Sequence, residues 1–283
     1  MTQREHWPEV ARWEQYLVHR EAAPATVERY LREARYFAAF ASERCVGSAA
    51  EIGREDVLAY KAKLLEERAP SGANTAIAAV NGFLAFVGHS ELKLRRLRVQ
   101  PMPRCAVDGI TKADYKKLVK AAHNKGDNVE ALLVQTLCST GIRVSELEAV
   151  TVDAVRVGYA VVRNKGRTRR VWFPERLCKL LTIHVFRQKI RSGPVFVTRS
   201  GNPIDRTRVW RILKELARLA GIEVRRVFPH ALRHLFATTF QRVHRDLESL
   251  SVLLGHARLE TTRLYLAEDE AERRRQVSCL GFV

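Results

Sequence analysis

The chain has 283 residues, of which 46% are hydrophobic and 28% charged, so it can build two domains with cores of their own. Lys and Arg number 49 against 31 Asp and Glu, and the net charge of +18 makes a nucleic acid the expected partner rather than an anionic membrane. Apolar runs are too short to span a bilayer, no signal peptide is recognised, and the five scattered cysteines lack zinc or disulfide spacing. We therefore expect a cytoplasmic protein with reduced thiols and without cofactor, metal or membrane partner.

The first domain is predicted to be helical throughout. Four segments carry apolar side chains at three- and four-residue spacing, typical of helices with one buried face: residues 7–19, 25–40, 54–67 and 75–87. Prolines and glycines separate them and indicate short loops. We predict a small helical bundle over residues 1–92.

A basic stretch follows over residues 93–108. It contains few apolar residues, two prolines and dense positive charge, which is typical of an extended linker. Three of its arginines are candidate contacts to a DNA backbone: Arg95, Arg96 and Arg98. Simple solvation of the linker is the alternative.

The second domain, residues 109–283, combines helices with one β-hairpin. A capping-box pattern at Thr111 and Asp114 begins a helix, and β-rich residues 159–163 and 169–173 flank a turn at 164–167. Further helical segments are predicted at about residues 128–139, 143–149, 175–188, 206–220, 230–243 and 247–254, with a final pair around Tyr265. The predicted fold class is mainly α with a small antiparallel β-sheet.

The chemistry of phosphodiester cleavage indicates which residues to look for. Without a metal, cleavage needs a nucleophile, cations on the non-bridging oxygens, an acid for the leaving oxygen and a group for the nucleophile's proton. Arg143 is expected at a helix start with Glu146 three residues on, and that carboxylate could orient the guanidinium toward a phosphate. The alternative is an ordinary surface ion pair.

Lys165 lies at the predicted hairpin tip. An amine among like charges gives up its proton more readily, which suits a donor to a leaving oxygen. The neighbouring Arg163, Arg167 and Arg169 are candidate DNA contacts. A basic hairpin that touches phosphates without catalysis is the alternative.

The last candidates are His230, Arg233, His256 and Tyr265. Pro229 marks a helix start, so His230 and Arg233, three residues apart, share a helix face near an end that favours phosphate. His256 follows a glycine that ends a helix, and Tyr265 comes nine residues later. Taken alone, the histidines could be ordinary surface residues and the tyrosine an ordinary packing residue. Only the combination of all six candidates favours catalysis: Arg143, Lys165, His230, Arg233, His256 and Tyr265.

Together these motifs resemble the tyrosine recombinase, or integrase, family. The matching segments are TGIRVSEL at 140–147, NKGRTRRV at 164–171, HALRHLFAT at 230–238, LLGH at 253–256 and TTRLYL at 261–266. Residues 25–37 resemble the SAM-like helical core-binding domain of the same family. The resemblance implies an α+β catalytic domain over residues 109–283.

The resemblance also implies roles for the six residues. Arg143 and Arg233 would clamp the scissile phosphate with a hydrogen bond from His256, and Glu146 would support them. Lys165 would protonate the departing 5′ oxygen, His230 would manage the phenol proton, and Tyr265 would form a 3′-phosphotyrosyl intermediate. No departure from the family pattern occurs at these positions.

Partners follow from the resemblance too. It implies double-stranded DNA with short inverted-repeat core sites and a homotetramer that joins two duplexes through a Holliday junction. The apolar residues Val277, Leu280, Phe282 and Val283 at the C-terminus would dock in a neighbouring copy, although packing on the same copy is an alternative. Such a recombinase would integrate, excise or resolve a mobile element or a replicon dimer.

Two other functions remain open at the level of sequence. One is DNA relaxation by a type IB topoisomerase-like enzyme that uses the same chemistry, and the other is a catalytically silent DNA-binding regulator. Covalent trapping on a nicked duplex separates the second from an enzyme. The target sequence, the host element, the need for accessory proteins and cis or trans attack by Tyr265 stay open.

Overall fold

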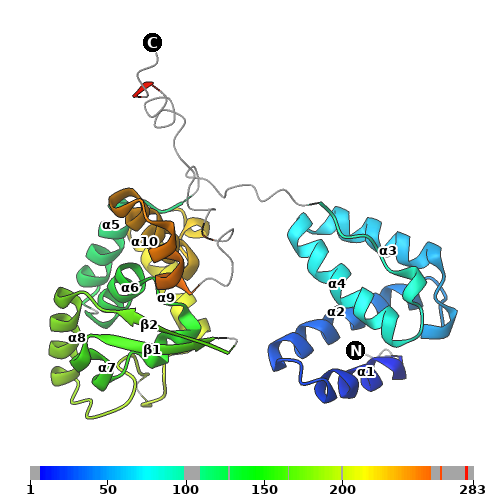
Figure 1. The fold of residues 1–283 in the computed structure, drawn as a ribbon, viewed down its shortest axis with the longest axis horizontal. Helices are drawn as coiled ribbons and strands as arrows, with labels where there is room; N and C mark the ends of the chain where they lie inside the picture. The colour runs from blue at the N-terminus through cyan, green and yellow to red at the C-terminus, as the bar shows by residue number, and fades with distance from the viewer. Residues whose placement is uncertain are drawn as a thin grey trace. The chain divides into compact units, whose positions relative to one another are not determined.

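The computed structural model describes residues 7–98, 109–126, 128–164, 166–198, 200–255, 262 and 278–279. The chain divides into two compact units, Met1–Gln100 and Pro101–Val283, each with its own hydrophobic core (Figure 1). Within the described ranges, no helix is long and apolar enough to cross a membrane.

The described part of the first unit, residues 7–98, contains four α-helices. They are α1 (Pro8–His19), α2 (Pro24–Glu43), α3 (Arg54–Glu67) and α4 (Pro70–Phe86), with 3-10 turns η1 (Ala49–Glu51) and η2 (Ser90–Leu92). The predicted bundle is confirmed. The helix expected from residue 75 begins at Pro70, because proline favours the first helical position, where its missing N–H is not needed.

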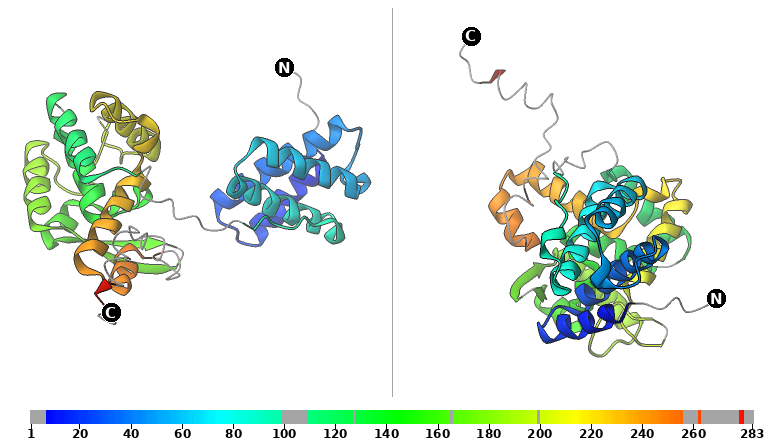
Figure 2. Two further views of the ribbon diagram at one scale, coloured as in Figure 1. Left: turned by 90° about the horizontal axis from the view of Figure 1, so that it is seen from above. Right: turned by 90° about the vertical axis from the view of Figure 1, so that its right-hand side faces the viewer.

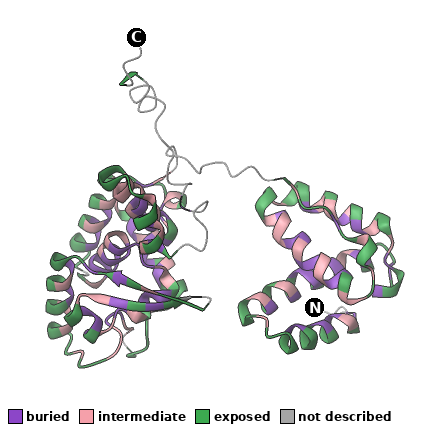
Figure 3. Ribbon diagram, in the orientation of Figure 1, coloured by how far each residue is buried: buried purple, intermediate pink, exposed green. Residues whose placement is uncertain are grey.

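Aromatic side chains fill the core of the first unit. Trp13 meets Phe83 edge-on with ring centroids 5.4 Å apart, and Phe37 meets Tyr60 in the same way at 5.1 Å. The buried residues lie on the inner faces of the helices (Figure 3). Burial of these large rings, together with that of the aliphatic side chains around them, stabilises the unit.

Two asparagines of α4 hold the extended segment that follows it. Asn81 donates to the Leu94 carbonyl at 2.9 Å and accepts from the Leu94 N–H at 2.8 Å. Asn74 makes the same pair with Leu97, at 2.9 and 2.7 Å. We call each pair of hydrogen bonds an asparagine clamp. The two asparagines are two helical turns apart and the two leucines are three extended residues apart, and both separations are about 10 Å, so both clamps can hold one straight segment.

The second unit is mainly helical around one hairpin. Its elements are α5 (Lys112–Asn124), α6 (Asn128–Thr140), η3 (Val144–Ala149), α7 (Val152–Val157), β1 (Tyr159–Asn164), β2 (Arg167–Trp172), α8 (Glu175–Arg187), α9 (Arg206–Leu219), η4 (Val224–Arg226), α10 (Pro229–His244) and α11 (Leu247–Leu254). The predicted fold class is confirmed. The capping box at Thr111 and Asp114 is present, with each side chain accepting from the other's backbone N–H, at 3.1 and 2.9 Å.

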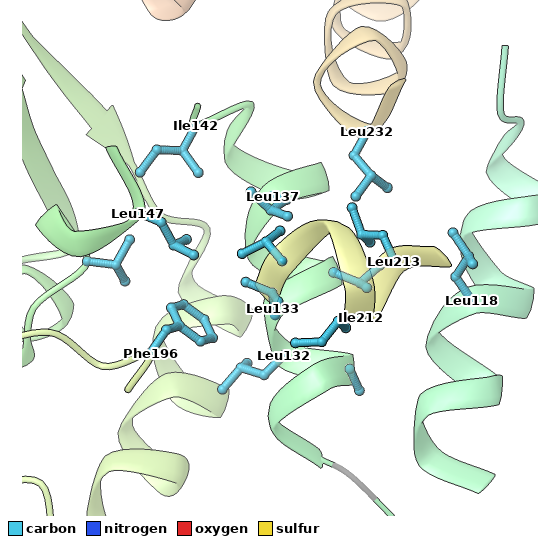
Figure 4. Packing of buried hydrophobic residues seen from close by; sticks show 14 of the residues in the cluster. Leu118, Leu132, Leu133, Leu137, Ile142, Leu147, Phe196, Ile212, Leu213 and Leu232 are labelled. Carbon is cyan, nitrogen blue, oxygen red and sulfur yellow. The ribbon is translucent and has the colours of Figure 1, made fainter. Parts of the chain in front are cut away.

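The core of the second unit is centred on α6. Figure 4 shows its leucines Leu133 and Leu137 between α9, which contributes Ile212 and Leu213, and the segment that carries Leu147. Toward the end of the chain, α10 and α11 (orange) pack side by side (Figures 1 and 2). The apolar packing therefore fixes η3, α10 and α11, which carry the candidate site.

Away from its loop, the hairpin has an inner face with buried residues and an outer face with more exposed ones. Asn164 pairs with Arg167, so a two-residue loop joins the strands, and Gly166 takes the left-handed φ of +75° that such loops require. Val162 is buried and lies opposite Arg169, whereas Val161 is exposed and lies opposite Arg170. Because paired residues share a face, Arg169 belongs to the inner face of the hairpin.

Candidate active site

Arg143 is positioned by a turn that needs glycine. Gly141 follows α6 with a φ of +62°, and a Cβ there would lie 2.6 Å from the Cδ1 of Phe236. Any side chain at position 141 would therefore displace the ring of Phe236 as well as strain the turn. The chain leaves this turn with Arg143 as the N-cap of η3.

Glu146 orients Arg143 at short range. Its Oε1 accepts from Arg143 Nη1 at 2.9 Å, and its Oε2 accepts from the Arg143 backbone N–H at 3.0 Å. The glutamate side chain is only 4% exposed, so water competes little for these bonds. The contact expected from the three-residue spacing is present.

Arg233 reaches the same place from α10. The residue is 2% exposed; its Nη1 donates to the carbonyl of Gly141 and its Nη2 to that of Leu254, the latter at 2.6 Å. Hydrogen bonds to two backbone carbonyls hold the plane of a buried guanidinium in one orientation.

The two arginines meet at the C-terminal end of α11. Arg143 Nη2 donates at 3.3 Å to the carbonyl of Gly255, the residue next to the Leu254 that accepts from Arg233. Carbonyls at a helix C-terminus carry partial negative charge and attract cations. Two guanidiniums from distant parts of the sequence are thus gathered directly before residue 256.

His230 lies in the first turn of α10, three residues before Arg233, and is exposed. His234, one turn further along, is half-buried, and burial together with the neighbouring His230 lowers its pKa. The imidazole of His234 is therefore neutral near pH 7.

Lys165, His256 and Tyr265 lie outside the described residues, as does the predicted helix pair around Tyr265 and most of the tail. Among the described residues, no group of three or more His, Cys, Asp or Glu could hold a metal ion. Of the five cysteines, Cys45, Cys138, Cys178 and Cys279 are described, and all four are free.

Most of the predicted DNA-contacting arginines are exposed. Arg95, Arg96 and Arg98 lie on the segment held by the two asparagines, and Arg163 and Arg167 lie toward the hairpin loop. These five guanidiniums are accessible to a phosphate backbone.

Arg169 differs from them. Its side chain is 10% exposed, and its Nη2 donates to Glu146 Oε2 at 2.8 Å. Burial, and then repulsion by Arg143, lower its pKa, although an arginine stays charged at all physiological pH values. The sequence holds a signal for this placement, since Arg169 shares strand parity with the buried Val171 and Phe173.

Comparisons with known proteins identify the family of the chain. Residues 109–272 match the model of the phage integrase family. The chain is 33% identical over 199 residues to tyrosine recombinase XerA of Pyrococcus furiosus, covering 68% of each chain. It is 27% identical over 269 residues to tyrosine recombinase XerD of Listeria monocytogenes, covering 88% of this chain and 90% of the relative.

A solved structure shows the same fold. The XerH site-specific recombinase bound to its difH substrate superposes with a TM-score of 0.71 at 18% identity, over 92% of this chain and 81% of that one. The match to the family model and to these relatives shows that the chain belongs to the phage integrase family. Within that family it is a tyrosine recombinase of the Xer and integrase type, an enzyme that cleaves and rejoins DNA at specific sites.

Proposed function

We propose that this recombinase cuts one DNA strand at a time with Tyr265 and conserves the bond as a 3′-phosphotyrosyl ester. The observation that carries the proposal is the convergence of Arg143 and Arg233 on the carbonyls of Leu254 and Gly255. The chain then continues directly into His256 and, nine residues later, Tyr265. The proposed nucleophile therefore follows, along the chain, the two carbonyls to which the two cations are bound.

In the proposed step the Tyr265 oxygen attacks phosphorus and the bond to the 5′ oxygen breaks. The phenol proton passes toward His230, and Lys165 gives a proton to the leaving 5′ oxygen. Arg143, Arg233 and His256 donate to the non-bridging oxygens, where negative charge develops. The reverse reaction with a second 5′ hydroxyl reseals the strand, because the ester retains the free energy of the original bond.

Exposed arginines supply contacts that do not depend on sequence. Arg95, Arg96 and Arg98 at the end of the first unit, with Arg163 and Arg167 on the hairpin, are placed to bind phosphates of double-stranded DNA. Such contacts set the register of the protein on DNA, while base contacts choose the site. We propose that the substrate is double-stranded DNA with short inverted-repeat core sites, and that the protein acts in the cytoplasm.

Four copies would act together on two duplexes and exchange strands through a Holliday junction. An apolar groove of about 310 Å³ on α5, α6 and α10 supports this assembly, because its lining offers apolar contacts to a short segment. We propose that it receives the C-terminal tail of a neighbouring copy, with Val277, Leu280, Phe282 and Val283. Resolution of replicon dimers, or integration and excision of a mobile element, would follow.

Covalent trapping tests the proposed chemistry. A duplex selected from a random-sequence pool by binding to the wild-type protein is nicked close to the cleavage position, so that the short cut strand diffuses away. We expect the wild-type protein to accumulate as a covalent adduct and the Tyr265→Phe variant to form none. Tyr159→Phe, which removes a phenol from β1, is the matched control and should react normally.

Each other outcome has a defined meaning. An adduct with Tyr265→Phe would show that another residue is the nucleophile. Tight binding without any adduct would identify a DNA-binding regulator. Relaxation of supercoiled plasmids that lack the selected sequence would indicate a topoisomerase-like activity instead.

A further inference from the structure

Arg169 is a largely buried cation beside the site, and the proposed mechanism does not use it. Its side chain lies on the inner face of the hairpin, opposite the buried Val162. Besides the bond from Nη2 to Glu146, its Nε and Nη1 are buried without a hydrogen-bond partner in the described part of the chain. Unsatisfied buried donors are costly, so their retention in this place calls for an explanation.

Glu146 connects Arg169 to Arg143. Its two carboxylate oxygens accept from Arg143 Nη1 at 2.9 Å and from Arg169 Nη2 at 2.8 Å. One carboxylate between two guanidiniums leaves the group with a net charge of +1, whereas Glu146 and Arg143 alone would be neutral. Arg169 therefore preserves positive charge at the position where Arg143 would meet a phosphate.

Gly255 provides a second link between the two arginines. A Cβ at this position would lie 2.5 Å from Arg169 Cδ and 2.6 Å from its Nε, so Arg169 packs directly on the glycine backbone. The carbonyl of the same glycine accepts from Arg143 Nη2 at 3.3 Å. Glu146 and Gly255 are thus neighbours of both arginines.

We propose that Arg169 is a positioning residue for strand cleavage, which acts through Glu146 and Gly255 to fix the guanidinium of Arg143 toward the scissile phosphate. This inference rests on the proposed function. A flat guanidinium suits the role, because it donates to the carboxylate at one edge while its side chain lies against the glycine. Lysine would keep the charge and lose that geometry.

The test compares cleavage with binding. The rate of adduct formation on the nicked duplex is measured at saturating protein, and the affinity for the intact duplex is measured separately. Because positioning matters mainly in the transition state, we expect Arg169→Gln to slow adduct formation by about 10-fold or more while affinity changes by less than about 3-fold. Arg169→Lys should give an intermediate loss.

Arg170→Gln is the matched control. Arg170 is the next residue of β2 and carries the same charge, but it is exposed on the outer face, over the rings of Tyr159 and Trp172. We expect this variant to cleave at the wild-type rate. Equal effects of Arg169→Gln and Arg170→Gln would overturn the inference, since general charge loss would then explain both.

A double-variant cycle tests the route through Glu146. If Arg169 acts through this carboxylate, Glu146→Gln combined with Arg169→Gln should cost little more than the slower single variant. Multiplied rate losses would show that Arg169 acts independently and would refute the proposed route. Thermal unfolding identifies variants that fail to fold. If Arg169→Gln fails to fold, the cleavage rate and the DNA affinity of Arg169→Lys are compared with those of the wild-type protein instead.

Failure of the inference is distinguishable from failure of the proposed function. If the wild-type protein forms no adduct, the phosphotyrosyl mechanism itself is wrong. If the wild-type protein forms the adduct and Arg169→Gln does so at the same rate, only the role of Arg169 is wrong.

Discussion

At the scale of single residues, the site depends on backbone atoms as much as on side chains. The carbonyls of Gly141, Leu254 and Gly255 hold the two arginines, and no sequence motif records a carbonyl's direction. Three-residue spacing did predict the contact between Arg143 and Glu146, because it is a local feature, whereas only the family resemblance grouped Arg233 with them. The separate environment of Arg169 was missed, because its charge outweighed the alternation of the strand.

The lowered pKa of His234 predicts how the stability of the second unit depends on pH. Burial and His230 lower its pKa, so below about pH 6.5 the unfolded chain takes up a proton there that the folded protein resists. The free energy of unfolding should therefore fall as the pH drops from 7 to 5. In His234→Gln this fall should be smaller, as thermal or chemical unfolding of the second unit across that range would show.

The exposed His123 serves as the control for this measurement. His123→Gln should keep the wild-type pH dependence. A His234→Gln variant that is as acid-sensitive as the wild-type protein would contradict the prediction.

At the scale of elements, helices of eight residues or more were predictable from their apolar spacing, although α4 begins at Pro70 rather than at residue 75, and shorter ones were not. Prolines at the first position mark α1, α2, α4 and α10, and the register of the hairpin follows from its turn. By contrast, α7 has only six residues, too few to show a helical period, and residues 144–149 form a 3-10 helix rather than the α-helix expected.

The asparagine clamps carry a prediction for the segment Lys93–Arg98. Asn74→Ala and Asn81→Ala each remove two hydrogen bonds to backbone, so each should lower the free energy of unfolding of the first unit by about 1–2 kcal/mol. In these variants the loosened segment loses conformational freedom when it binds DNA, and this entropy loss weakens binding. Affinity should fall several-fold, whereas the slope of log affinity against log salt concentration should stay unchanged, because no charge is lost.

Thr75→Ala is the matched control on the same helix, since the Thr75 hydroxyl donates only to the Ser71 carbonyl. It should leave DNA affinity unchanged. A smaller dependence of log affinity on log salt concentration in the asparagine variants would mean that the clamps determine how many phosphates are contacted. That result would contradict the prediction, in which the clamps only order the segment.

At the scale of the whole molecule, assembly depends on how one copy meets the next. A tail that leaves one copy and enters a groove on another is a head-to-tail contact, and such contacts can close into a ring of four. The groove is bordered by Val243, which is 69% exposed at the end of α10. A substitution at Val243 can therefore alter the groove without removing a buried core residue.

Two variants test this contact from opposite sides. Deletion of residues 277–283 removes the tail, and Val243→Glu places a carboxylate at the groove; both should bind a single duplex normally and fail to form the complex with two duplexes. Val252→Glu is the control, because Val252 is 73% exposed on α11 and does not line the groove. A mixture of the two variants should form pairs, since one tail can still enter one intact groove, but no closed assembly of four, as light scattering of the DNA complexes would show. Normal assembly by either variant alone would refute the proposed docking.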